Sequence, residues 1–261
     1  MSLVQGVDGA LYGTTSTGGA HKSGSVFKRW LSGGMSVLYS FCAQTNCTDG
    51  KTPYAGLILG TDGNFYGTTY SGGAHQGGTV FKISPTGALT TLYSFCSSAS
   101  CADGSNSNAP LLQASDGNFY GTTFAGGLAA VGGFPDTNGS RPAGSVVQAT
   151  DGNFYGATTY GGPSTACSGN GCGTIFSLSV GLGPFVKTVP TSAKMGTAVT
   201  IVGTSLTGVS SVSFNGTPAA FTVVSRFQIK TTVPSGATSG FVTVTTSNGT
   251  LQSNVVFRVL P

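Results

Sequence analysis

The residues best suited to chemistry are aspartates that recur within one short phrase. "DGNFYGTT" occupies residues 62–69 and 116–123, and it returns as "DGNFYGAT" at 151–158 and as "DGALYGTT" at 8–15. Carboxylate and amide oxygens are the ligands that Ca²⁺ prefers, and the ion takes about six to eight of them. If these turns gather around one axis, they could form a calcium site that polarises the carbonyl group of a substrate. The candidate ligands are Asp8, Asp62, Asp116, Asp151, Asn64, Asn118 and Asn153.

The same phrase has a purely structural interpretation. Asp-Gly between short strands is a strong hairpin signal, because glycine tolerates a positive φ and aspartate can bond its own backbone. The tyrosines and phenylalanines of the phrase could stack on a sugar ring, but alternating aromatic residues in strands more often pack in a core. The sequence leaves both interpretations of the aspartates open.

Two histidines occupy equivalent places, His21 in "GGAHKSG" and His75 in "GGAHQGG". A glycine-rich loop can present an imidazole as a general base, and a nearby aspartate would orient it. A histidine in a solvated loop also needs no function. The chain has no G-x-S-x-G or H-E-x-x-H motif, and the absence of glutamate excludes a Glu-based glycosidase pair but not an Asp pair.

Six cysteines form three pairs of identical spacing, in "CAQTNC", "CSSASC" and "CSGNGC". Zinc needs about four converging ligands, and no second pair or histidine is placed to complete such a site. We therefore predict local disulfides, which favour an extracellular, cell-surface or periplasmic location. The predicted pairs are Cys42–Cys47, Cys96–Cys101 and Cys167–Cys172.

Composition favours an all-β protein. Of 261 residues, 43 are glycine and only 7% are charged, while 39% are hydrophobic. Many glycines beside abundant Thr, Ser and Tyr predict short strands and tight turns. The basic residues are scattered, so no nucleic-acid partner is expected, and no apolar run is long enough to predict a membrane span. The opening "MSLVQGVDGALYG" lacks a signal-peptide pattern, so we expect a removed leader or, preferably, a start partway through a longer gene product.

Internal repeats organise residues 1–181. Repeats are predicted near 3–56, 57–110, 111–145 and 146–181, the last two being incomplete. Each full repeat predicts four strands; in the second these are "LILGT", "NFYGTTY", "TVFKIS" and "LTTLYSF". About 50 residues with four antiparallel strands is the unit of a β-propeller blade, so a β-propeller-like domain is predicted, with an open β-solenoid as the alternative. Exposed sheet edges could support a homo-oligomer.

Composition changes after about residue 184. Residues 184–261 contain no acidic residue and about seven short Val/Thr-rich segments with frequent turns, which predicts an immunoglobulin-like β-sandwich. The segments "VTIVGTSL", "VSFNGTPA" and "TTVPSGATSG" resemble an IPT/TIG domain. That resemblance implies an immunoglobulin-like module of cell-surface proteins, often a spacer or adhesive unit.

The repeat region resembles a second family. "DGNFYGTTYSGGAHQGGTVFKISPTGALTTLYSF" is similar to the bacterial GloVer tandem-repeat proteins, and this likeness implies an extracellular repeat protein without a settled activity.

Two functions follow as hypotheses. The first is an extracellular module that binds glycan or protein partners and is displayed on an IPT/TIG domain. The second is a metal-dependent hydrolase, of lactonase, esterase or glycosidase type, that acts on a lactone, ester or glycan with Ca²⁺ as its only cofactor. His21 and His75 are the candidate catalytic bases of the second hypothesis.

Overall fold

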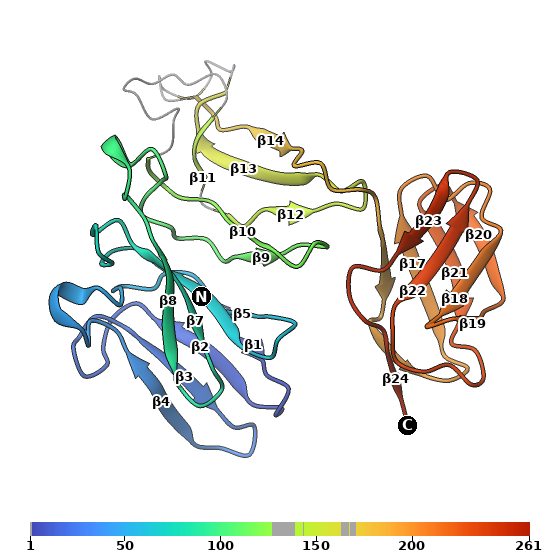
Figure 1. Ribbon diagram of the computed structural model, residues 1–261, viewed down its shortest axis with the longest axis horizontal. Helices are drawn as coiled ribbons and strands as arrows, with labels where there is room; N and C mark the ends of the chain where they lie inside the picture. Colours follow the sequence, from blue (N-terminus) through green and yellow to red (C-terminus); the bar gives the residue numbers. More distant parts are fainter. Residues whose placement is uncertain (1, 127–138, 143, 163–166, 168–170) are drawn as a thin grey trace. The chain divides into compact units, whose positions relative to one another are not determined.

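The computed structural model describes residues 2–126, 139–142, 144–162, 167 and 171–261 (Figure 1). The described residues form strands, turns and two single-turn 3₁₀ helices, and they include no α-helix. By its contacts the chain divides into two units. The first unit comprises Met1–Gln113, Phe119–Val147 and Tyr155–Ser177, and the second comprises Ala114–Asn118, Gln148–Phe154 and Leu178–Pro261.

The first repeat forms a four-stranded antiparallel meander. Its strands are β1 (Val4–Gln5), β2 (Leu11–Thr15), β3 (Ser25–Arg29) and β4 (Met35–Ser40), hydrogen-bonded in that order. The second repeat rebuilds the same sheet from β5 (Ile58–Leu59), β6 (Phe65–Thr69), β7 (Thr79–Ile83) and β8 (Leu89–Ser94). The four strands predicted for a full repeat are confirmed, because each hairpin has the turn residues that its sequence indicated.

The later repeats are shorter. Among the described residues, the third repeat contributes β9 (Leu112–Gln113) and β10 (Phe119–Tyr120), which pair with each other. A further sheet joins β11 (Ser140–Pro142), β12 (Val147–Gln148) and β14 (Ile175–Leu178) to β13 (Phe154–Tyr160). The blade-like meander is therefore present in full in the first two repeats, while closure into a propeller stays a prediction.

Residues from Val186 onward form two facing antiparallel sheets. One sheet runs β15 (Val186–Val189), β17 (Ala198–Gly203), β21 (Gln228–Thr232) and β20 (Phe221–Ser225). The other runs β19 (Thr217–Pro218), β18 (Ser211–Phe214), β22 (Val242–Thr246) and β23 (Gly249–Gln252), and β16 (Ser192–Lys194) pairs in parallel with β24 (Arg258–Leu260). The strands alternate buried and partly exposed residues, and the buried ones, including Ile201, Phe214 and Val244, form one core. The predicted immunoglobulin-like sandwich is confirmed.

The repeats have their own core, between the first and second sheets. It contains Tyr12, Val26 and Phe41 from the first repeat together with Phe65 and Phe81 from the second, and all five are fully buried. The aromatic residues of the recurring phrase therefore lie between sheets, as the core interpretation predicted. None of the described residues belongs to a helix that could cross a lipid bilayer.

Candidate functional site

The four Asp-Gly turns have one geometry. In each turn a carboxylate oxygen of the aspartate accepts a hydrogen bond from the amide two residues later, with N–O distances of 3.2, 3.1, 3.0 and 2.9 Å in chain order. The glycine that follows has φ between 79° and 91°, a conformation that residues with a side chain rarely adopt. The aspartates concerned are Asp8, Asp62, Asp116 and Asp151. Each carboxylate thus stabilises its own turn.

The asparagines of the phrase bond to the same carboxylates. Asn64 donates its side-chain amide to Asp62 at 2.8 Å, Asn118 donates to Asp116 at 2.8 Å, and Asn153 donates to Asp151 at 3.1 Å. In the first two repeats a tyrosine hydroxyl also donates, from Tyr12 to Asp8 at 2.7 Å and from Tyr66 to Asp62 at 2.8 Å. In the second, third and fourth turns the residues predicted as metal ligands therefore bond one another.

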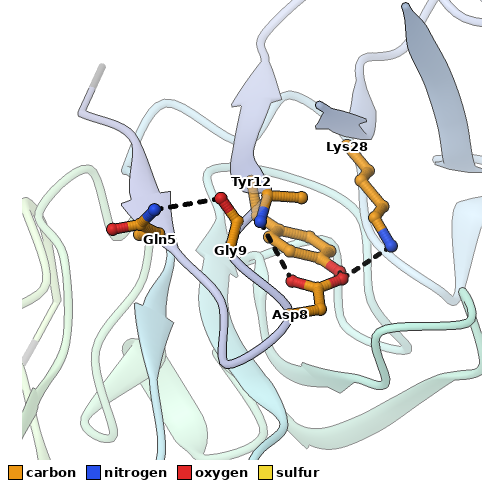
Figure 2. A network of polar contacts seen from close by, with 6 residues as sticks. Gln5, Asp8, Gly9, Tyr12 and Lys28 are labelled. Atoms are coloured by element: carbon orange, nitrogen blue, oxygen red, sulfur yellow. Dashed lines mark hydrogen bonds and ion pairs between the residues drawn. The ribbon is translucent and has the colours of Figure 1, made fainter. Parts of the chain in front are cut away.

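The first repeat adds a cation to this arrangement. Lys28 Nζ lies 2.7 Å from the Asp8 carboxylate, and Figure 2 shows Lys28 and Tyr12 both directed at that carboxylate. The hydrogen bond from Lys28 and that from Tyr12 lower the pKa of Asp8 to about 2. Bonding to Asp8 in turn raises the pKa of Lys28. Both groups are charged at neutral pH, so neither is poised to transfer a proton.

The equivalent aspartate of the second repeat reaches a similar state by a different route. Burial alone would raise the pKa of Asp62, but hydrogen bonds from Asn64 and Tyr66 outweigh it and the net shift is downward. Burial and the neighbouring carboxylate raise the pKa of the Tyr66 hydroxyl to about 12. Tyr66 therefore remains a hydrogen-bond donor across the whole neutral range.

The predicted calcium ligands come from turns of separate repeats. Within the described part of the chain, no three His, Cys, Asp or Glu side chains lie close enough together to hold a metal ion. The structure brings each aspartate together with the partners in its own turn. Calcium binding stays a prediction, and any such site would need backbone oxygens or a different arrangement of the turns.

The candidate bases His21 and His75 lie in equivalent exposed loops. The carbonyl oxygen of His21 accepts a hydrogen bond from the Ser23 hydroxyl at 3.1 Å, which shapes the loop around the imidazole. A catalytic role for either histidine stays a prediction.

All three predicted disulfides are present: Cys42–Cys47, Cys96–Cys101 and Cys167–Cys172. The first two enclose the 3₁₀ turns η1 (Thr45–Cys47) and η2 (Ala99–Cys101). An oxidised cysteine framework and the immunoglobulin-like domain together indicate an extracellular protein.

Each of the first two disulfide loops is held in shape by its own aspartate. The fully buried Asp49 accepts the backbone amides of Ala43 and Gln44, at 2.9 and 3.2 Å, and the hydroxyl of Tyr39 at 2.8 Å. Burial raises the pKa of the Tyr39 hydroxyl, and the hydrogen bond to Asp49 raises it further. The aspartate of "CTDG" thus holds the turn that the disulfide closes.

Asp103 repeats this arrangement around the second disulfide. It accepts the Tyr93 hydroxyl at 2.7 Å and the amides of Ser97 and Ser98 at 2.9 and 3.1 Å. The bond from Tyr93, with those from Ser97 and Ser98, lowers the pKa of Asp103. The same sequence pattern, an aspartate two residues after the second cysteine, thus gives the same cap twice.

The disulfide loop of the first repeat also bonds to the second repeat. The carbonyl oxygen of Cys47 accepts the amide of Gly73 at 2.9 Å, and the side chain of Gln76 donates to the Asn46 carbonyl at 2.9 Å. Lys51 then pairs with Ser71 in a two-bond antiparallel bridge. Ser105 and Ala125 form the same bridge between the second and third repeats.

Glutamines add a cross-repeat contact that sequence reasoning missed. Gln113 accepts the amide of Thr61 at 3.0 Å, and Gln148 accepts the amide of Ser115 at 2.9 Å, so each one reaches back to the Asp-Gly turn of the preceding repeat. Gln5, at the same position in the first repeat, instead donates to Gly9 of its own turn, as Figure 2 shows. The recurrence of Gln three residues before the aspartate was the available signal.

The Asp-Gly turn, the disulfide loop and the backbone bridge between repeats, which we call the crossover, all recur along the chain. Such recurrence is a feature of a tandem repeat, and the comparison with known families agrees. The Gloeobacter/Verrucomicrobia repeat family matches residues 1–134. The chain belongs to this repeat family. The IPT/TIG domain family matches residues 184–259, as the resemblance of that segment predicted. No curated protein matches the sequence.

Successive Gloeobacter/Verrucomicrobia repeats are joined by aromatic stacking. The ring of Phe65 in the second repeat stacks on Tyr12 of the first at a centroid distance of 4.0 Å. Phe119 of the third repeat stacks on Tyr66 of the second at the same distance. Each of these rings packs against a ring of the neighbouring repeat. The aromatic residues of "FYG" therefore form the junction between repeats.

Proposed function

We propose that this chain is a non-catalytic extracellular module that binds a protein partner through the exposed surfaces of its repeats. The observation that carries the proposal is the state of the recurring aspartates. Asp8, Asp62, Asp116 and Asp151 each accept hydrogen bonds within their own turn, and Asp8 also pairs with Lys28. The hydrogen bonds of the repeat thus give each of these aspartates a structural role.

The exposed side chains of the first repeat favour protein over glycan as the partner. Trp30, Leu31, Met35 and Val37 lie in or beside the β3–β4 hairpin and are all exposed. Aromatic residues and methionine are enriched at protein–protein interfaces. A glycan site would also need converging polar groups to bond sugar hydroxyls, and three of these four side chains offer none.

The IPT/TIG domain supports the same proposal as a display unit. Its sheets are built around a fully buried apolar core, and a rigid sandwich of this kind can hold a binding module away from a surface. The cell surface and the periplasm are both compatible with the disulfides, and we propose the cell surface.

The hydrolase hypothesis depends on the same aspartates and on His21 or His75. Cleavage of a lactone, ester or glycan would need Ca²⁺ to bind oxygens that now accept hydrogen bonds within the turns. It stays a prediction, and no contact of the described residues favours it over the binding module.

Calcium binding and hydrolysis can be tested together on the full chain. We expect no calorimetric heat of Ca²⁺ binding, no change in melting temperature between Ca²⁺ and EDTA, and no turnover of lactone, ester or glycoside substrates. Asp62→Asn and His75→Ala are the test variants, and Tyr66→Phe is the matched control because it removes a bond to Asp62 while leaving the carboxylate. EDTA-sensitive hydrolysis that Asp62→Asn abolishes and Tyr66→Phe retains would overturn the proposal.

A further inference from the structure

Each repeat sheet has two different faces, and the way they pack is seen twice within the chain. We call one the Tyr face, which in the first repeat carries Val4, Tyr12 and Val26, and the other the Phe face, which in the second repeat carries Leu57, Phe65 and Phe81. These two faces meet in the buried core between the first and second repeats. The stacked pairs Tyr12–Phe65 and Tyr66–Phe119 show that a Tyr face receives the Phe face of the next repeat.

The Phe face of the first repeat has the same construction but no cover. Its residues are Leu3, Leu11, Phe27 and Met35, at the positions of Leu57, Phe65, Phe81 and Leu89. Leu57 is 3% exposed, whereas Leu3 is 53% exposed and Met35 is 61% exposed. Leu3 and Met35 on this face are thus exposed, while Leu11 and Phe27 are partly buried.

The Tyr face of the fourth repeat is uncovered as well. Its exposed residues are Val147 and Ile175, at the positions of Val4 and Val26. Val26 is fully buried, whereas Val147 is 57% exposed and Ile175 is 80% exposed.

A glycine confirms that these sheets are built alike. A Cβ at Gly67 would lie 2.7 Å from the Phe81 ring and 2.9 Å from Leu57, and a Cβ at Gly13 would lie 2.8 Å from Phe27 and 2.7 Å from Leu3. The glycine of "YGTT" therefore seats the same phenylalanine and leucine against the sheet whether or not another repeat covers them. The uncovered Phe face has the shape of the covered one.

We propose that a second copy of this chain docks through these faces, with the Tyr face of its fourth repeat on the Phe face of the first repeat. The inference rests on the proposed binding function and names its partner. The two faces differ, so the contact is heterologous, and every copy keeps one free face of each kind after docking. Association is therefore head to tail and continues beyond the dimer unless the rotation closes a ring.

One residue weakens the contact. Arg29 is exposed at the position where the second repeat has the fully buried Ile83. Covering this face brings the guanidinium toward an apolar surface, which costs desolvation free energy. The result is reversible association that depends on concentration. Arg29→Ile gives the first repeat the side chain of the covered face, and we expect it to tighten association by about tenfold or more.

The test is sedimentation velocity of the full chain over a wide range of concentration. We expect the average mass to rise above that of one chain with increasing concentration. Met35→Asp and Ile175→Asp each place a charge on one face and should weaken association by about tenfold or more. Val224→Asp is the matched control, because Val224 is an exposed valine of the IPT/TIG domain outside both faces, and it should associate as the unsubstituted chain does. Circular dichroism confirms that each variant is folded.

Mixing the two charged variants separates this contact from a symmetric one. Met35→Asp keeps its Tyr face and Ile175→Asp keeps its Phe face, so the mixture should form dimers that grow no further, at concentrations where each variant alone is still mostly monomeric. A chain that is monomeric at every concentration would overturn the inference, as would association that Ile175→Asp leaves unchanged. Either result leaves the calcium and hydrolysis measurements as the independent test of the proposed function.

Discussion

The first and second repeats have nearly the same sequence, but their equivalent residues lie in different surroundings. Phe81 is fully buried against the first repeat, while Phe27, its counterpart, is only partly buried. Strands, turns and disulfide loops match in the two repeats because local sequence determines them. Burial does not match, because it depends on whether another sheet lies over the face. The comparison separates what a repeat does alone from what it does in an array.

The largest expected effect comes from truncating the two equivalent phenylalanines. Phe81→Ala leaves a cavity between sheets and should lower the free energy of unfolding by about 3 to 5 kcal/mol. Phe27→Ala removes a ring that already contacts water, and it should cost only about 1 to 2 kcal/mol. Urea unfolding of dilute protein measures both values. Equal losses would mean that packing of the first repeat over Phe81 contributes nothing to the free energy of unfolding.

A smaller difference is expected from the two equivalent glycines. An added Cβ at residue 67 would press on the buried Phe81 ring, so Gly67→Ala should destabilise by about 1 to 3 kcal/mol. At residue 13 the crowded Phe27 and Leu3 lie on an uncovered face and can move outward, so Gly13→Ala should cost less than about 1 kcal/mol. Thermal and urea unfolding report the difference. A larger loss at residue 13 would show that the two faces are not alike in rigidity.

The smallest effect concerns the two equivalent aspartates and is seen in their titration. Lys28→Met removes the strongest cause of the low pKa of Asp8, so that pKa should rise from about 2 toward its ordinary value of 3.8. Lys82→Met is the control, because Lys82 lowers the pKa of Asp62 less than the hydrogen bonds from Asn64 and Tyr66 do. NMR titration of the side-chain carboxyl carbons measures both. An unchanged Asp8 pKa in Lys28→Met would contradict the importance of this ion pair.

The sign of the pH effect on stability follows from the same shift. The folded state holds the Asp8 carboxylate ionised at a pH where the unfolded chain has bound a proton. Asp8 therefore contributes stability that is complete above about pH 4. That contribution is lost as the pH falls toward about 2. In Lys28→Met the loss should shrink, and acid unfolding should depend less on this carboxyl group.

Much of the fold could be predicted from particular residues. Asp62-Gly63 indicated a hairpin turn, and the alternation in "TVFKI" indicated a half-buried strand, because turn chemistry and side-chain period are local properties. The equal spacing of the cysteine pairs indicated short-range disulfides for the same reason. The immunoglobulin-like sandwich followed from Val/Thr-rich segments and their turns, and its IPT/TIG character followed from the resemblance to that family.

Other features depend on contacts that the sequence does not display. Ser140–Pro142 pairs with β13 through Thr158 and Tyr160, in the place that Lys51 and Ser71 occupy earlier, although the sequence "SRP" does not resemble the "KTP" of the first repeat. The crossover uses backbone groups, so its side chains are free to vary. Likewise, Lys28 of β3 bonds Asp8 in the turn between β1 and β2, and the spacing of the two residues gave no sign that they pair. The gathering of four aspartates at one axis was a global expectation, and no local pattern could decide it.

The crossover between repeats has a mechanical consequence. The chain that leaves the first repeat, at Lys51 and Thr52, is already hydrogen-bonded to Ser71 and Tyr70 of the second before it enters that repeat's first strand. Cys47, one end of a covalent loop, anchors the same place through its carbonyl bond to Gly73. A pulling force along the chain must therefore break bonds held beside a disulfide before it can peel a sheet apart. The hydrogen bonds between repeats would bear the force, and the repeats would unfold one at a time.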